Sequence, residues 1–134
     1  MRNHVRLAGG ALALGLALAG CAGLRTERQG RDTGRAICDI KSADSADAAR
    51  QALDKANQHF DKAKTITGRR VDDDVRNVQN NLNDLVNHVG DGQKTLAQQD
   101  IAAINRNVQQ AVDTTTGLTR RYYQGVAEGL GDCT

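Results

Sequence analysis

Three cysteines carry the most distinctive chemistry of this 134-residue chain, and they stand far apart at Cys21, Cys38 and Cys133. No two of them form a Cys-x-x-Cys pair, the spacing typical of redox sites and of zinc sites. A lone thiol can instead receive a lipid, or it can pair with a distant thiol in an oxidising compartment. The segments around each cysteine decide between these two fates.

Other side chains that could do chemistry are few and isolated. Ser42 and Ser45 stand where helix caps are expected, and no Gly-x-Ser-x-Gly elbow surrounds them. His59 and His88 fall on different predicted helices, well apart along the bundle, which argues against a shared metal. The aspartates at positions 72–74 point in three directions and suit the positive end of a helix dipole. We therefore expect no enzymatic activity, no metal and no cofactor.

The segment Arg120-Arg121-Tyr122-Tyr123 is the most suggestive surface feature of the sequence. Arginine and tyrosine are enriched at the energetic centres of protein interfaces, and aromatic residues gather at membrane headgroups. The pattern predicts an interaction surface made of these four side chains. The alternative is that Tyr122 closes a seam between helices while the two arginines face water near a helix terminus.

The first 20 residues have the pattern of an export signal. Arg2 and Arg6 come first without an acidic neighbour, and a run of apolar and small residues follows from Leu7 to Ala19. A permanent transmembrane helix needs about 20 apolar residues, so this run is too short for a comfortable span. It matches the roughly 7–15 apolar residues of a cleavable signal peptide. We expect residues 1–20 to be removed and to take no part in the fold.

The signal ends in Leu18-Ala19-Gly20-Cys21, which resembles the lipobox of bacterial lipoproteins. The resemblance implies that Cys21 receives a diacylglyceryl group, becomes the first mature residue and carries palmitate-type acyl chains. It also implies attachment to the cell membrane or outer membrane, on the extracytoplasmic side. The alternative is an ordinary secretory signal that happens to end near a cysteine. The mature part resembles the small lipoproteins of high-GC bacteria.

Cleavage changes the charge balance of the chain. The loss of Arg2 and Arg6 leaves equal numbers of basic and acidic side chains, which argues against nucleic acid as a partner. Residues 21–36 are rich in glycine and arginine, lack apolar periodicity and predict a flexible tether behind the lipidated cysteine. The charged residues of this segment are Arg25, Glu27, Arg28, Arg31, Asp32 and Arg35. Its arginines either approach an anionic membrane or are simply solvated.

Residues 37–134 predict an all-α domain. Three segments repeat apolar residues at alternating spacings of three and four, the seam of a small antiparallel helical bundle. The first seam is Ala46, Ala49, Leu53, Ala56, Phe60 and Ala63; the second is Val71, Val75, Val78, Leu82, Leu85 and Val89; the third is Ala97, Ile101, Ile104, Val108 and Ala111, continued by Thr115, Leu118 and Tyr122. The seam is narrow and rich in alanine and valine, so we expect marginal stability without further support.

A disulfide between Cys38 and Cys133 would provide that support. Export places both thiols in an oxidising compartment, and lipidation of Cys21 leaves them as the two candidates. In a plain three-helix bundle they would lie at opposite ends, whereas a disulfide needs Cα atoms within about 7 Å. The run of threonines before Gly117 is a poor helix interior. A disulfide therefore implies a break near Gly117 and a short fourth helical segment that folds back from Leu118 to Leu130.

The sequence as a whole predicts a membrane-anchored cell-envelope lipoprotein that acts as a non-enzymatic protein-interaction module. Its partner would be another envelope protein or a second copy of the chain. The alternative function is that of a carrier, which holds a lipid or a small hydrophobic ligand between its helices. A carrier needs a concave apolar pocket, and the narrow seam argues against one.

Overall fold

The computed structural model describes residues 2–67 and 70–134, and the side chains of residues 21–65 and 77–134. The elements in chain order are α1 (Arg2–Lys41), α2 (Ala46–Thr67), α3 (Arg70–Gly90), α4 (Lys94–Thr114) and α5 (Gly117–Leu130). No strand occurs in the described ranges, which confirms the all-α class. The expected bundle of three helices with a possible short fourth segment has to be corrected to five described helices: α5 is the fourth segment, and α1 is a helix that was not expected.

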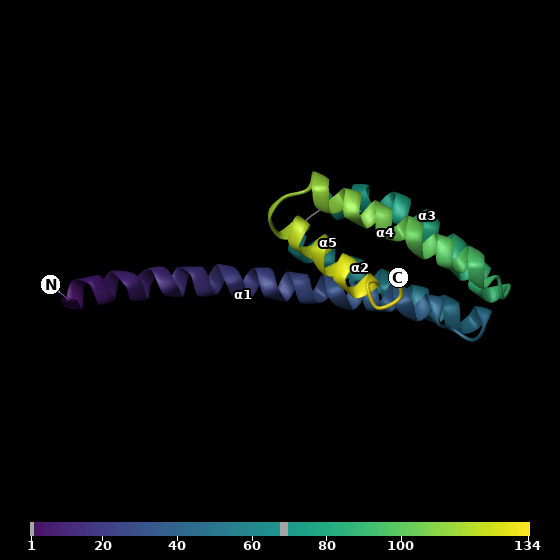
Figure 1. Cartoon of the computed structure of the whole chain (residues 1–134), viewed down its shortest axis with the longest axis horizontal. Coiled ribbons are helices and arrows are strands. Elements are labelled where there is room, and N and C mark those ends of the chain that lie inside the picture. The colour runs from purple at the N-terminus through teal and green to yellow at the C-terminus, as the bar shows by residue number, and fades with distance from the viewer. Residues whose placement is uncertain (1, 68–69) are drawn as a thin grey trace.

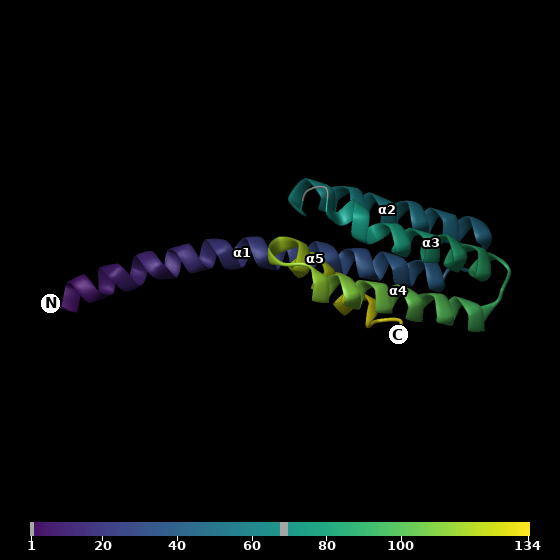
Figure 2. The ribbon, with the colours of Figure 1, turned by 90° about the horizontal axis from the view of Figure 1, so that it is seen from above.

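The helices form a bundle from which the first half of α1 extends alone (Figure 1). Helices α1 to α4 run alternately in opposite directions, and α5 runs in the same direction as α1 (Figure 2). The parallel helices α1 and α5 lie in extensive contact along α5. The C-terminal residues therefore lie beside the end of α1, where Cys133 is bridged to Cys38.

The expected flexible tether at residues 22–36 is instead an ordered part of α1. The buried positions of α1 from residue 23 onward are Gly34 and Ala36, together with a stripe formed by Gly23, Thr26, Gly30, Thr33, Ile37 and Ile40. The positions of the stripe alternate in spacing between three and four, so a helical stripe was present in the sequence. The stripe was overlooked because its first four members are glycines and threonines, which a search for apolar periodicity does not register. Physically, this small-residue face is suited to close contact with another helix.

The predicted break near Gly117 is confirmed. Helix α4 ends at Thr114, and Thr115 and Thr116 adopt extended backbone conformations. Gly117 follows with φ +64°, a left-handed conformation that glycine adopts without the steric penalty of a Cβ atom. The chain reverses here, and α5 returns along the bundle next to α1.

The predicted seams of the three central helices are largely confirmed. The buried core of these helices contains Ala49, Ala56, Phe60, Ala63, Val78, Leu82, Leu85, Ala97, Ile101, Ile104, Val108 and Ala111. The side chains of Val71, Val75 and the aspartates 72–74 lie outside the described ones. Leu118 departs from the expectation, because it is 39 % exposed. The break at Gly117 resets the helical phase, so the stripe of α4 does not continue into α5.

Candidate functional site

The contact between α1 and α5 brings the chemistry-bearing ends of the chain together. Glycines lie four residues apart on both helices: Gly30 and Gly34 on α1, Gly125 and Gly129 on α5. A Cβ atom at Gly30 would lie 2.0 Å from the carbonyl oxygen of Tyr122, and one at Gly125 would lie 2.0 Å from that of Glu27. The two backbones therefore touch, which a larger residue at either position would prevent.

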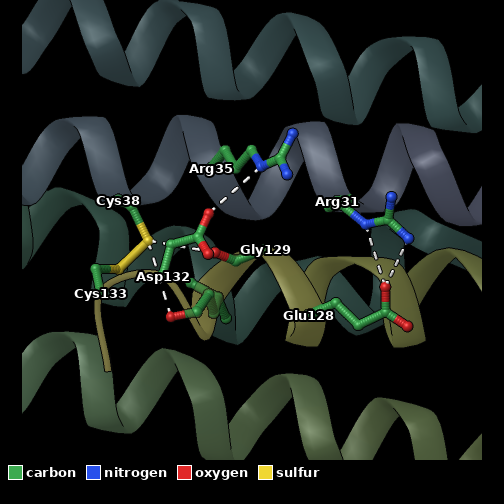
Figure 3. Close-up of polar contacts among 8 residues, drawn as sticks. Arg31, Arg35, Cys38, Glu128, Gly129, Asp132 and Cys133 are labelled. Atoms are coloured by element: carbon green, nitrogen blue, oxygen red, sulfur yellow. Dashed lines mark hydrogen bonds and ion pairs between the residues drawn. A yellow bond between two sulfur atoms is a disulfide. The ribbon is translucent and has the colours of Figure 1, made fainter.

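Ion pairs run along the edge of this contact. Arg31 pairs with Glu128 at 2.9 Å and Arg35 with Asp132 at 3.4 Å (Figure 3). Near the start of α5, Arg121 pairs with Glu27 at 3.4 Å. Half of the arginines that we expected in a solvated tether thus bind α5 instead. The pairs are partly exposed, so each stabilises the contact only modestly.

Glu27 and Glu128 also interact with each other across the same edge. A hydrogen bond to Glu128, in which the protonated Glu27 is the donor, is the main cause that raises the pKa of Glu27 above its ordinary value, and partial burial adds to it. That hydrogen bond and the neighbouring Arg31 lower the pKa of Glu128. Two carboxyls with divergent pKa values can act as an acid–base pair. Here Glu27 also pairs with Arg121 and Glu128 with Arg31, both across the helix contact. We therefore assign the two carboxyls a role in holding α1 against α5.

Tyr122 fills the centre of the contact rather than a surface. Its side chain is fully buried, and its hydroxyl lies 2.8 Å from the hydroxyl of Thr33. The hydroxyl of Thr33 donates to the carbonyl oxygen of Gln29, so the tyrosine is the donor of the shared bond. Burial raises the pKa of Tyr122 well above its usual range and keeps it protonated. Phe60 meets the ring edge to face, which ties α2 to the pair.

The predicted surface at Arg120, Arg121, Tyr122 and Tyr123 is therefore not formed as one surface. Tyr122 and Tyr123 are both buried, whereas the two arginines are exposed. Consecutive residues on a helix point about 100° apart, so four in a row cannot share a face. The alternative, in which Tyr122 closes a seam and the arginines face water, describes the structure.

The predicted bridge between Cys38 and Cys133 is present. The Cα atoms of the two residues lie 5.6 Å apart, and the bridge joins positions 95 residues distant in the sequence. It lies beyond the last ion pair of the α1–α5 contact, as Figure 3 shows. The ammonium group of Lys41 donates to the carbonyl oxygen of Cys133 at 3.1 Å and holds the end of the chain. The disulfide, the three ion pairs and the close contact at the glycines together hold α5 against α1 along its whole length. We call this set of contacts the α1–α5 lock.

Cys21 is exposed and unbridged on α1, two residues before Gly23. A Cβ atom at Gly23 would meet the Arg121 side chain at an ordinary distance of 3.7 Å. The bundle thus begins immediately after the cysteine, with no slack chain between them. The side chains of Leu18, Ala19 and Gly20 lie outside the described ones. In the part of the chain searched, no helix has an apolar stretch long enough to cross a membrane.

Ser45 and His88 have local structural partners. The hydroxyl of Ser45 accepts a hydrogen bond from the backbone N–H of Ala48, as expected of a helix cap. Nδ1 of His88 lies 2.5 Å from a carboxylate oxygen of Asp100, which joins α3 to α4. Among the described residues, no group of three or more His, Cys, Asp or Glu side chains could hold a metal ion.

A depression of about 570 Å³ lies at the opposite end of the bundle from Cys21, between the α1–α2 turn and the α3–α4 turn. Its lining consists of Lys41, Ser42, Ala43, Asp44, Val89, Gly92, Lys94, Ala97 and Gln98. Two lysines and an aspartate in this lining would have to be desolvated by an apolar ligand, which is costly. The depression therefore does not suit a hydrophobic cargo.

The α1–α5 lock is the feature that the sequence reasoning missed. A signal for it was present in the sequence, because two pairs of glycines have a spacing of four residues. An arginine directly follows each glycine of the first pair, and an acidic residue stands three positions after each glycine of the second pair. The chain matches no protein-family model, and no curated protein or solved structure shows significant similarity to it. Its function has to be inferred from its own residues.

Proposed function

We propose that this chain is an exported lipoprotein whose helical bundle binds another envelope protein, or a second copy of itself, without catalysing a reaction. Acyl chains on Cys21 would hold it on the extracytoplasmic side of the cell membrane or outer membrane. The observation that carries the proposal is the position of Cys21, exposed and directly before the locked α1–α5 pair. An anchor at this position holds a rigid body rather than a loose domain.

The surface available for binding is rich in side-chain amides. Exposed amides on α3 and α4 are Asn77, Asn80, Asn83, Asn87, Gln98, Gln99, Gln109 and Gln110. Each amide can both donate and accept hydrogen bonds, which suits recognition of polar groups on a protein partner. Binding of a hydrophobic cargo is less well supported, because aromatic and aliphatic side chains fill the centre of the bundle.

Metabolic labelling tests the anchor. A fatty-acid analogue should label the wild-type protein, and Cys21→Ala should abolish the label and leave the precursor uncleaved before residue 21. Cys38→Ser with Cys133→Ser is the matched control and should keep the label, because these cysteines are bridged to each other. Labelling that survives Cys21→Ala would overturn the proposal.

Crosslinking in the native envelope tests the interaction. A photoreactive residue at Asn83 or Asn87 should give one discrete adduct, whose partner mass spectrometry can identify. The control position is Arg50, which is exposed on α2 and paired with Asp47. Indistinguishable products from the two surfaces would contradict a binding face on α3.

A further inference from the structure

Exposed leucines gather at the end of the bundle that carries Cys21. Among the described residues, three large hydrophobic side chains are exposed: Leu24 at 63 %, Leu118 at 39 % and Leu96 at 37 %. Leu24 stands three residues after Cys21 on α1, and Leu118 is the second residue of α5. Leu96 lies at the start of α4, at the far end of the bundle (Figure 1).

The register of α1 and α5 places Leu24 and Leu118 at the same level of the bundle. The contacts between these parallel helices join residues 89–98 positions apart, and the pair Glu27–Arg121, near the start of α5, has a separation of 94. Leu24 and Leu118 have the same separation of 94 and therefore stand at the same level of the bundle. One helical residue rises about 1.5 Å, so Cys21 lies within about 5 Å of this level along α1.

Unpaired arginines surround the two leucines. Arg31, Arg35 and Arg121 form ion pairs in the α1–α5 contact, whereas Arg25, Arg28 and Arg120 are exposed and have no ion pair within the described residues. A depression of about 390 Å³ adjoins them on α5, lined by Gly117, Arg120, Arg121 and Gln124. Of the described acids without an ion pair, Asp32 on α1 and Asp113 near the end of α4 lie nearest to this end, whereas Asp39, Asp54 and Asp84 lie further along the bundle. Among the described side chains, positive charge is therefore in excess around the leucines.

We propose that this end of the bundle, formed by Leu24, Arg25, Arg28, Leu118 and Arg120, rests on an anionic lipid surface. The inference depends on the proposed acylation of Cys21, which would insert lipid chains within one helical turn of Leu24. The leucines enter the boundary between headgroups and acyl chains, and the arginines bind headgroup phosphates. Each arginine near such a surface contributes on the order of fivefold in affinity. Docking holds the bundle at a defined orientation instead of leaving it to swing.

A single polarity-sensitive fluorophore tests the docking. In the full-length lipidated protein, Leu118→Cys supplies a unique free thiol, because Cys21 is acylated and the other two cysteines are bridged. In vesicles of phosphatidylcholine and phosphatidylglycerol, emission from position 118 should shift to the blue and be quenched by brominated lipids. Leu96→Cys is the matched control and should stay water-like. Equal behaviour of the two positions would overturn the docking.

Charge substitutions provide the second arm of the test. Replacing Arg25, Arg28 and Arg120 by glutamine should reduce the quenching at position 118 several-fold, as should vesicles of phosphatidylcholine alone. The charge-matched control replaces Lys55, Lys94 and Arg106, which are exposed elsewhere on the bundle. Loss of quenching in both variants, or in neither, would contradict the assignment of these arginines.

Flotation of the vesicles separates this inference from the proposed function. Protein that floats while the probe at position 118 remains in water retains its anchor and overturns the docking alone. Protein that fails to float overturns the anchor and the docking together.

Discussion

Individual glycines set the distance between α1 and α5. A Cβ atom at Gly30 would clash with the carbonyl oxygen of Tyr122. The hydroxyl of Tyr122 is hydrogen-bonded to Thr33, which lies one helical turn after Gly30 on α1. Separating the helices would therefore break a buried hydrogen bond as well as van der Waals contact. Gly30 therefore stabilises the fold because it has no side chain, which allows the two helix backbones to come into contact.

Gly30→Ala tests this contribution. The methyl group must push α5 away, and we expect the free energy of unfolding to fall by about 1–3 kcal/mol despite the higher helix propensity of alanine. Urea denaturation followed by circular dichroism measures the change. Gly23→Ala is the matched control on the same helix. Its Cβ atom would lie 3.7 Å from the nearest atom of Arg121, an ordinary van der Waals distance, so this substitution should be neutral or stabilising. Equal destabilisation by both would show that the close contact is misplaced.

Helices of this protein are held in place by seams between neighbours and by polar links near their ends. Leu82 is fully buried in the seam of α3, while the next residue, Asn83, faces solvent. Adjacent positions on one helix thus experience opposite environments, as the alternating spacing of three and four predicts. Helix α3 is joined to α4 by the pair His88–Asp100 near their connecting turn.

Leu82→Asp should unfold most of the bundle at 37 °C. An unpaired buried carboxylate costs several kcal/mol, and a domain of this size has only about 5–15 kcal/mol in total. Far-ultraviolet circular dichroism should show the loss of helix. Asn83→Asp adds the same charge one residue further on and should leave the spectrum unchanged. If the two variants behave alike, the seam of α3 is wrong.

The link between α3 and α4 should depend on pH. The hydrogen bond with Asp100, which outweighs partial burial, raises the pKa of His88 above its ordinary value of 6.5. Its contribution to stability is therefore complete below pH 6.5 and is lost as the pH rises through the raised value in the folded state. Asp100→Asn should lower the pKa of His88 in an NMR titration and flatten this pH dependence. An unchanged titration would show that another group sets it.

The molecule as a whole is closed by its last helix. Helix α5 packs on α1 and also contacts α4 and α2, so it completes a bundle whose central seams alone are thin. Ion pairs, the shared hydroxyl bond and the disulfide all act on this one helix. The anchor proposed at Cys21 therefore attaches to the most strongly secured part of the molecule.

The disulfide should account for a large part of the global stability. In the chain-entropy model, closing a loop of this length contributes about 4.5 kcal/mol. Cys38→Ser with Cys133→Ser should lower the urea midpoint markedly, and a reductant should do the same to the wild type. A non-reduced digest should contain a peptide that links the two cysteines. Identical midpoints with and without reductant would show that the bridge contributes nothing.

Much of the fold could be predicted from local pattern. The seams at Leu82 and Ile101 follow from helical periodicity, and the start of α2 follows from the capping residue Ser45. The bridge followed from the choice of cysteines once Cys21 was set aside for a lipid. The break at Gly117 then followed from the bridge, because a distance limit acts on the chain regardless of its tertiary details.

The order of residues 22–36 and the burial of Tyr122 were decided by the tertiary structure. A glycine stripe has no side chains to hide from water, so hydrophobic periodicity does not detect it. Its value depends on a second glycine pair that lies about 95 residues later in the chain. A tyrosine is amphipathic, and its exposure depends on which helix covers it. Both outcomes arise from the pairing of two distant helices, which no local pattern encodes.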